Sequence, residues 1–195
     1  MTERELYLLR HGDIGKQGCY IGSTDLPLSV TGRQQIINIA TIIGLQKIDA
    51  ILCSPMLRCR ESYELLRLSC PCRFDYLLKE IDFGVWEGKS FSEITRDHAD
   101  IVTQWATDPE HFCFPSGESM QDFYSRIESI QNLLEEYRHK RVLLVTHGGI
   151  IRHLLCRYLG IPREKYLVFD VQPGSLSSLT LHSEGGVLTG LNQRG

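Results

Sequence analysis

Short apolar runs alternate with longer amphipathic stretches along most of this 195-residue chain. The runs Glu5–Leu9, Asp49–Cys53 and Arg141–Val145 have the length and composition of buried strands. Between them lie stretches whose apolar residues recur at helical spacing, such as the one that runs from Ser119 to Tyr137. Strands that alternate with helices are typical of a parallel sheet covered on both faces. The pattern therefore predicts an α/β fold with a mostly parallel central sheet between two layers of helices.

Capping residues and glycines indicate where the first helices begin and end. Ser29 or Thr31 is suited to cap a helix that Gly44 stops. Ser54 is expected to cap a second helix, with Pro55 at its first position.

The C-terminal part continues the alternation. A helix over Ile150–Leu159 is expected to end at Gly160, and Ser175–Leu181 alternates as a strand does. Gly185-Gly186 predicts a turn into a last strand near Leu188. This last strand would offer a pairing edge, so a homodimer stays open. A short strand is also predicted over Arg73–Tyr76.

Composition excludes several classes of protein. There are 21 Lys and Arg residues against 24 Asp and Glu residues, a net charge of −3, which argues against a nucleic-acid partner. No apolar run has the length of a membrane span, and Met1 to Glu5 do not resemble a signal peptide. The seven cysteines are odd in number and irregularly spaced, which favours free thiols. We therefore expect a single domain over residues 1–195, in the cytoplasm and away from membranes.

Two buried strands end in the same pair of residues. His11-Gly12 follows the first strand, and His147-Gly148 follows the strand Arg141–Val145. Ligands of open α/β sheets bind beyond the carboxyl ends of strands. A single histidine there is well explained by a local hydrogen bond, but the repeated pattern predicts that His11 and His147 meet at one site.

Charged residues near these strand ends strengthen the prediction. Arg10 precedes His11 at the end of an apolar strand, where packing explains a guanidinium poorly and recognition of an oxyanion explains it well. Arg58 and Arg60 lie one turn into the second predicted helix, and spacing alone suits a solvated face equally well. Glu80 begins an aromatic and glycine-rich segment in which a carboxyl group could lie beside apolar walls.

Seven short motifs occur in the order found in the histidine phosphatase (phosphoglycerate mutase-like) superfamily. The chain resembles this superfamily from about residue 5 to residue 182. The motifs are Arg10-His11-Gly12, Tyr20-Ile21-Gly22, Pro27 to Gly32, Ser54 to Arg58, Glu80 to Gly88, Gly117-Glu118-Ser119 and His147-Gly148-Gly149. Within the superfamily, Ser23 to Leu28 and Asp82 to Gly88 look most like the alpha-ribazole phosphatases, which act in cobalamin assembly. The resemblance implies a three-layer α/β/α sandwich of the phosphoglycerate mutase type.

The resemblance also implies a role for each matching residue. His11 would attack phosphorus to give a phosphohistidine, and Glu80 would protonate the leaving oxygen and then deprotonate the attacking water. Arg10, Arg58 and His147 would surround the oxygens of the phosphoryl group, so neither a metal nor another cofactor is expected.

Substrate binding is assigned to a second set of residues. The resemblance places Gly12, Gln17, Ile21, Gly22 and Gly148 around a small-molecule phosphate ester.

Two positions depart from the family pattern. Ile14 stands where the family usually has a hydroxyl residue, and Gln17 replaces the usual asparagine, with a longer reach. Neither change touches the five predicted catalytic groups, but both alter the shape of the pocket and thus bear on the substrate. Trp105, Phe112 and Phe114 suit stacking on a substrate ring and core packing equally well.

Three functions remain open. The first is a metal-independent phosphomonoesterase, with alpha-ribazole-5′-phosphate as one candidate substrate. The second is a phosphoglycerate mutase, although the mutases of this family resemble a longer chain with an insertion where this one has only residues 89–116. The third is a catalytically weak phosphate-binding regulatory protein, which Ile14 and Gln17 suggest and which intact His11 and Glu80 argue against.

Overall fold

The computed structural model describes residues 4–137 and 140–195. Within this part of the chain, a 6-stranded sheet has the order β3-β2-β4-β1-β5-β6. The strands are β1 (Arg4–Arg10), β2 (Ala50–Cys53), β3 (Cys72–Phe74), β4 (Arg141–Thr146), β5 (Leu176–His182) and β6 (Gly185–Gln193). The pairs among β3, β2, β4 and β1 are parallel, whereas β5 pairs antiparallel with β1 and with β6. The sheet is therefore mostly parallel, as predicted.

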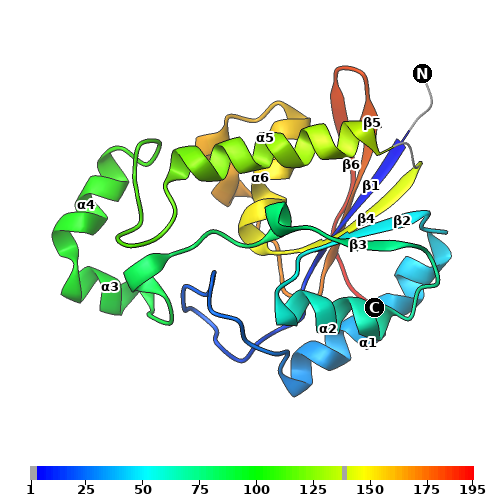
Figure 1. Cartoon of the computed structure of the whole chain (residues 1–195), viewed down its shortest axis with the longest axis horizontal. Helices are drawn as coiled ribbons and strands as arrows, with labels where there is room; N and C mark the ends of the chain where they lie inside the picture. The colour runs from blue at the N-terminus through cyan, green and yellow to red at the C-terminus, as the bar shows by residue number, and fades with distance from the viewer. Residues whose placement is uncertain (1–3, 138–139) are drawn as a thin grey trace.

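Helices cover both faces of this sheet. They are α1 (Val30–Leu45), α2 (Leu57–Leu66), α3 (Phe91–Asp97), α4 (Ala99–Thr107), α5 (Met120–Glu136) and α6 (Gly148–Leu159), with 3-10 helices η1 (Tyr76–Leu78), η2 (Gly84–Trp86) and η3 (Arg163–Val168). Figure 1 shows α1 and α2 on one side of the sheet, α5 and α6 on the other, and α3 and α4 beyond its end. No helix in the described ranges combines the length and apolar character that a membrane crossing needs. The arrangement confirms the α/β/α sandwich.

The core has one half on each face of the sheet. Leu6 and Leu8 of β1 join the cluster under α5 and α6, whereas Tyr7 and Leu9 join the cluster under α1 and α2. This division follows from the alternation of side chains along a strand. Because β1 is buried on both faces, it reads as a continuous apolar run, and the polar residues that follow it mark where the core ends.

The register of the strands determines where the site lies. Arg10 of β1 lies beside Thr146 of β4, and Cys53 of β2 lies beside Val145 of the same strand. Three adjacent parallel strands thus end at one edge of the sheet, and the residues that follow them meet there.

Two predicted helix boundaries are wrong. α1 continues through Gly44 to Leu45, so Gly44 does not stop it, and a left-handed backbone conformation occurs after the helix at Lys47, with φ 52°. A glycine costs a helix only about 1 kcal/mol, which the packing of the buried face of α1 outweighs. Pro55 lies before α2 rather than in it, because the carboxylate of Asp25 accepts a hydrogen bond from the Leu57 amide at 2.7 Å and caps the helix there.

Two strand boundaries also differ from prediction. The strand predicted over Arg73–Tyr76 is β3 (Cys72–Phe74), because Asp75 accepts a hydrogen bond from the Leu77 amide at 3.0 Å and starts η1. Gly185 and Gly186 are the first residues of β6, and the turn before them is formed by residues 183–184.

Candidate active site

His11 lies directly after β1 with its ring almost fully buried. Its Nδ1 is 2.8 Å from the carbonyl oxygen of Gly12. A carbonyl oxygen only accepts, so Nδ1 carries the ring proton and Nε2 keeps its lone pair. Burial lowers the pKa of His11 well below 6.5, and the nearby charges of Arg10 and Arg58 lower it further. The ring is therefore neutral at physiological pH, as a nucleophile must be.

His147, after β4, lies against His11, with ring centroids 5.1 Å apart. The Nε of Arg58 donates to Nδ1 of His147 at 3.1 Å, so that nitrogen is the acceptor and Nε2 bears the proton. Nε2 in turn donates to the hydroxyl of Ser54, 2.9 Å away, just beyond β2. Burial, with the charge of Arg58, also holds the pKa of His147 well below 6.5. The three strand ends thus supply His11, His147 and Ser54 to one network.

Arg58 is fully buried at the start of α2, which excludes the solvated helix face that its spacing also allowed. Its terminal nitrogens donate to the carbonyl oxygens of Gly22 and Thr24 at 2.8 and 2.9 Å. The carboxylate of Glu87 holds that loop from the other side: it accepts from the amides of Gly22 and Ser23, both at 2.9 Å. The hydroxyl of Thr24 donates to it as well, at 2.6 Å.

Arg10 is a second cation of the site and is partly buried. One terminal nitrogen donates to the carbonyl oxygen of Val171 at 2.7 Å, whereas the buried Nε has no hydrogen-bond partner among the described residues. In the described part of the chain, no carboxylate lies within ion-pair distance of Arg10 or Arg58. Burial lowers the pKa of Arg10, which is the electrostatic cost of keeping this charge away from water. One buried and one partly buried guanidinium, without a counterion among the described residues, form a site for an anion.

Glu80 reaches the same site from the loop after η1. Its carboxylate accepts hydrogen bonds from the amides of Gly149 and Ile81 at 2.9 and 3.1 Å. Gly149 lies in the first turn of α6, where backbone amides and the helix dipole favour a carboxylate. A side chain at Gly149 would overlap the carboxylate of Glu80, so the close approach requires glycine there.

Two adjoining cavities open onto these groups. The inner one, of about 460 Å³, is lined by Arg10, His11 and Glu80 together with polar loop residues. The outer one, of about 500 Å³, shares Arg10, Ile21 and Glu80 with it and is otherwise mostly apolar. Its ring-bearing lining residues are Tyr20, Phe83, Phe91, Trp105, Phe114, Phe123, His153 and Tyr166. The arrangement suits an ester with an anionic end and a bulky apolar group.

The predicted substrate-binding residues occupy different positions. Gln17 and Ile21 line the inner cavity, and Gly148 lines the outer one. Gly22 contacts Arg58 through its carbonyl oxygen. A side chain at Gly12 would collide with the backbone of Gly32, so glycine there lets α1 approach β1.

Ile14, the other departure from the family pattern besides Gln17, can also be placed. Ile14 packs against the core under α1 and α2 and borders the inner cavity. Asp13 takes over a local polar role: one oxygen accepts from the amide of Gly15 at 2.9 Å and from the hydroxyl of Ser29 at 2.6 Å. The loop is thus held without a hydroxyl at position 14.

The three aromatic residues that suited either substrate stacking or core packing take different positions. Phe112 is core packing, since it is buried and lines neither cavity. Phe114 and Trp105 line the outer cavity. They also pack on Trp86, with ring centroids 5.3 and 5.6 Å from it, so the wall of this cavity is continuous with the core.

Three residues at or near the site were not predicted from the sequence to take part in it. Ser54 was expected to cap a helix and lies in a family motif, as Glu87 does, but neither was assigned a role in the site. Arg152, which lines the outer cavity, carries no motif at all. The only available signal was the position of Ser54 directly after a buried strand.

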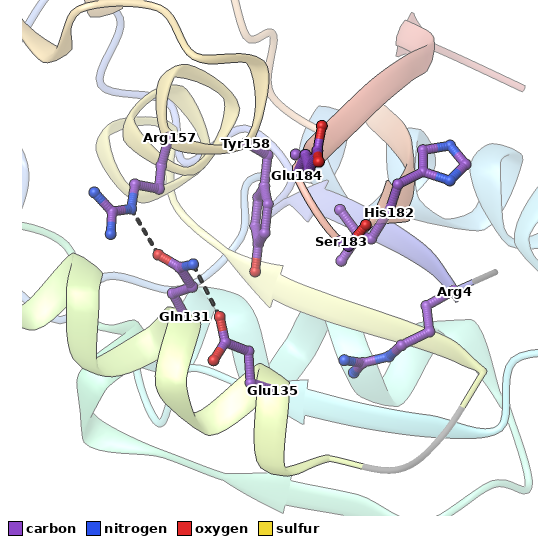
Figure 2. Close-up of a pocket in the computed structure, with 10 residues that line it drawn as sticks. Arg4, Gln131, Glu135, Arg157, Tyr158, His182, Ser183 and Glu184 are labelled. Carbon is purple, nitrogen blue, oxygen red and sulfur yellow. Dashed lines mark hydrogen bonds between the residues drawn. The ribbon is translucent and has the colours of Figure 1, made fainter. Parts of the chain in front are cut away.

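A larger cavity lies elsewhere. It measures about 780 Å³, and its lining includes Arg4, Arg157 and Glu184 (Figure 2). Because Arg4 begins β1 and Arg10 ends it, the strand rise separates this cavity from His11 by about 20 Å. None of the predicted catalytic residues lines this cavity, whereas Arg10, His11 and Glu80 line the inner one. In the described residues, no group of three or more His, Cys, Asp or Glu side chains could hold a metal ion.

Sequence comparison decides the family. The sequence model of the histidine phosphatase superfamily (branch 1) matches residues 6–194. The chain belongs to this superfamily. It is 29% identical over 194 residues to the adenosylcobalamin/alpha-ribazole phosphatase of Escherichia coli (strain K12), covering 97% of this chain and 96% of the relative.

Solved structures of this superfamily agree in fold. The crystal structure of the alpha-ribazole phosphatase from Shigella flexneri has a TM-score of 0.89 and 29% identity, covering 97% of this chain and 96% of the other. A mycobacterial glucosyl-3-phosphoglycerate phosphatase has a TM-score of 0.85 and 25% identity, covering 98% and 100%. The phosphoglycerate mutase-like sandwich expected from the motifs is confirmed.

Proposed function

We propose that this histidine phosphatase hydrolyses phosphate monoesters of small molecules through a phosphohistidine at His11. The observation that carries the proposal is the neutral, buried imidazole of His11 beside the buried guanidinium of Arg58 and the partly buried one of Arg10, neither of which has a carboxylate partner among the described residues. An anion with several oxygens satisfies both cations, and a phosphoryl group also offers His11 an electrophile.

The reaction has two steps. In the first, Nε2 of His11 forms a bond to phosphorus, the bond from phosphorus to the ester oxygen breaks, and Glu80 gives that oxygen its proton. In the second, Glu80 takes a proton from water, whose oxygen attacks phosphorus and releases His11 and inorganic phosphate. The chain supplies the positive charge itself, through Arg10 and Arg58, so the proposal needs no metal.

Arg58 and His147 form the wall behind His11. Arg58 has N–H groups beyond those that bond Gly22, Thr24 and His147, and these are its donors to phosphoryl oxygens. The resemblance also makes His147 a direct phosphoryl ligand. For that contact, its Nε2–H must exchange the hydroxyl of Ser54 for a phosphoryl oxygen.

For the substrate, we propose alpha-ribazole-5′-phosphate or a related ester with a flat ring in its leaving group. Relatives of this chain carry that activity in their names. The ring-bearing lining of the outer cavity supports the same choice, because flat rings pack well against aromatic faces.

The proposal extends to organisation and location. We propose one histidine phosphatase domain over residues 1–195, supported by a family match over residues 6–194. We further propose that it acts in the cytoplasm on a freely diffusing ester, as a monomer or as a homodimer paired through the edge strand β6.

Turnover in the presence of a chelator tests this function. The protein is expected to hydrolyse p-nitrophenyl phosphate in EDTA and to prefer alpha-ribazole-5′-phosphate to 3-phosphoglycerate in a panel of esters. Folded protein without any phosphatase activity would refute the proposed reaction. Activity that EDTA abolishes would refute its metal-free form.

A further inference from the structure

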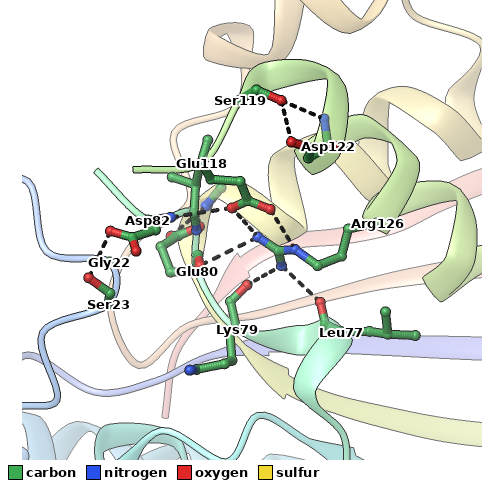
Figure 3. Close-up of polar contacts among 12 residues, drawn as sticks. Gly22, Ser23, Leu77, Lys79, Glu80, Asp82, Glu118, Ser119, Asp122 and Arg126 are labelled. Atoms are coloured by element: carbon green, nitrogen blue, oxygen red, sulfur yellow. Dashed lines mark hydrogen bonds and ion pairs between the residues drawn. The ribbon is translucent and has the colours of Figure 1, made fainter. Parts of the chain in front are cut away.

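A buried ion pair lies beside the segment that carries Glu80 (Figure 3). Arg126 of α5 binds Glu118 through two parallel contacts, with Nε 2.9 Å from one carboxylate oxygen and a terminal nitrogen 2.6 Å from the other. Only 15% and 17% of the two side chains are exposed. A buried pair of this kind is weak evidence for a contribution to stability, since apolar residues of the same volume often serve as well.

Arg126 also fixes the main chain before Glu80. Its guanidinium donates to the carbonyl oxygen of Leu77 at 2.9 Å, to that of Lys79, and to that of Glu80 at 3.4 Å. Only the fork of an arginine offers enough donors for two carboxylate oxygens and three carbonyls at once. An apolar replacement would leave these carbonyls without a donor.

Glu118 holds the main chain after Glu80. A carboxylate oxygen of Glu118 accepts from the amide of Asp82 at 3.3 Å, and its own amide donates to the carbonyl oxygen of Asp82 at 2.9 Å. The ion pair therefore forms hydrogen bonds with the main chain on both sides of Glu80, in a segment that belongs to no strand or α-helix.

We propose that Arg126, locked by Glu118, is the positioning residue for Glu80 in proton transfer. Arg126 lines neither active-site cavity, so it acts only through the backbone of Glu80. That backbone directs the carboxylate onto the amide of Gly149 and into both cavities. Proton transfer requires the acid within hydrogen-bond reach of the leaving oxygen, so a small displacement of the segment reduces it. This inference rests on the proposed phosphatase function.

Leaving-group dependence tests the inference. Phenyl phosphate and p-nitrophenyl phosphate share a ring, but phenoxide is the poorer leaving group and needs the acid more. In Arg126→Met/Glu118→Gln, which leaves no unpaired buried charge, we expect kcat/KM for phenyl phosphate, which reports the step in which the ester bond breaks, to fall by about 10- to 100-fold. For p-nitrophenyl phosphate the loss is expected to stay below about 3-fold. Arg126→Lys, which keeps some of the carbonyl contacts, should lie between wild type and the double variant.

A matched control and a structural readout complete the test. Arg141 and Glu5 form an ion pair 2.7 Å long at the opposite end of β1, and Arg141→Met/Glu5→Gln should leave the ratio of the two rates unchanged. A crystal structure of the Arg126 double variant should show the Glu80 carboxylate displaced from the Gly149 amide.

Three outcomes decide between the claims. Equal losses for both esters, or a Glu80 carboxylate that has not moved, would overturn the role of Arg126. If the double variant does not fold, Arg126→Lys decides by the same ratio. Wild-type protein that hydrolyses neither ester would instead contradict the proposed function itself.

Discussion

The Nε of Arg58 lies 3.1 Å from Nδ1 of His147, and this contact determines the tautomer of a buried imidazole. Because a guanidinium only donates, the ring proton of His147 must be on Nε2, which faces Ser54. The same guanidinium is bound to the loop that Glu87 organises. A phosphoryl group bound beside His11 would thus meet an Arg58 guanidinium whose orientation the protein has already set.

Replacing Arg58 by lysine should inactivate the enzyme while leaving it folded. An ammonium group cannot reach His147, Gly22 and Thr24 together, so the fixed donors are lost. We expect kcat/KM for p-nitrophenyl phosphate to fall about 100-fold or more. Arg60, on the same helix but with its guanidinium 6.0 Å from the exposed ring of Phe74, is the matched control. Arg60→Lys should retain wild-type activity, and similar losses in both variants would contradict the role of Arg58.

Glu80→Gln should slow the hydrolysis of poor leaving groups selectively. The amide keeps the shape of the carboxyl group but transfers no proton, so alkyl phosphates should lose about 100-fold or more in kcat/KM. Aryl phosphates with good leaving groups should lose much less. The ratio of the two kcat/KM values measures the effect, because kcat/KM reports the step in which the ester bond breaks. Equal losses would show that Glu80 is not the acid.

Glu87→Gln should weaken catalysis through Arg58. The carboxylate accepts from the amides of Gly22 and Ser23 and from the hydroxyl of Thr24, and an amide side chain replaces one acceptor oxygen by a donor. We expect a loss of about 10-fold in kcat/KM, with weaker inhibition by vanadate, which mimics the transferring phosphoryl group. Glu164→Gln, on an exposed 3-10 helix, is the control. Unchanged vanadate inhibition in Glu87→Gln would contradict the coupling.

Stability should fall as the pH drops below about 6.5. Burial lowers the pKa of His11 and His147 well below 6.5, and it lowers that of His153 to about 4. Below pH 6.5 the unfolded chain therefore binds protons that the folded chain does not, and acid favours unfolding. Each such histidine costs about 1.4 kcal/mol per pH unit in that window.

Urea unfolding at pH 7.5 and 5.5 measures this dependence. The free energy of unfolding should be lower at pH 5.5, and His153→Phe should reduce the difference between the two values. Equal stability at both pH values in wild-type protein would show that these histidines do not titrate as their burial implies.

Much of the fold and the convergence of the site were predictable, because both follow from local patterns. A buried run that ends in His-Gly occurs twice, and parallel strands end at one edge, so His11 and His147 had to be near each other if β1 and β4 were neighbours. Spacing alone did not decide whether Arg58 faced solvent.

The rest depended on contacts between distant segments. Asp25 caps α2 from another part of the chain, so the beginning of that helix was misplaced at Pro55. Glu87 and Arg126 act on backbone amides and carbonyls, which leave no pattern in the sequence. These contacts depend on the three-dimensional arrangement of the loops, which the sequence pattern does not specify.

Trapping the intermediate tests the central claim most directly. Protein quenched in denaturant during turnover of a radiolabelled phosphate ester should carry label that is lost in acid, kept in base and located on His11 by peptide mapping. His11→Ala should carry none, whereas a variant at exposed His111, His111→Ala, should be labelled like wild type. Rapid turnover without label on His11, or label on another residue, would contradict a phosphohistidine mechanism.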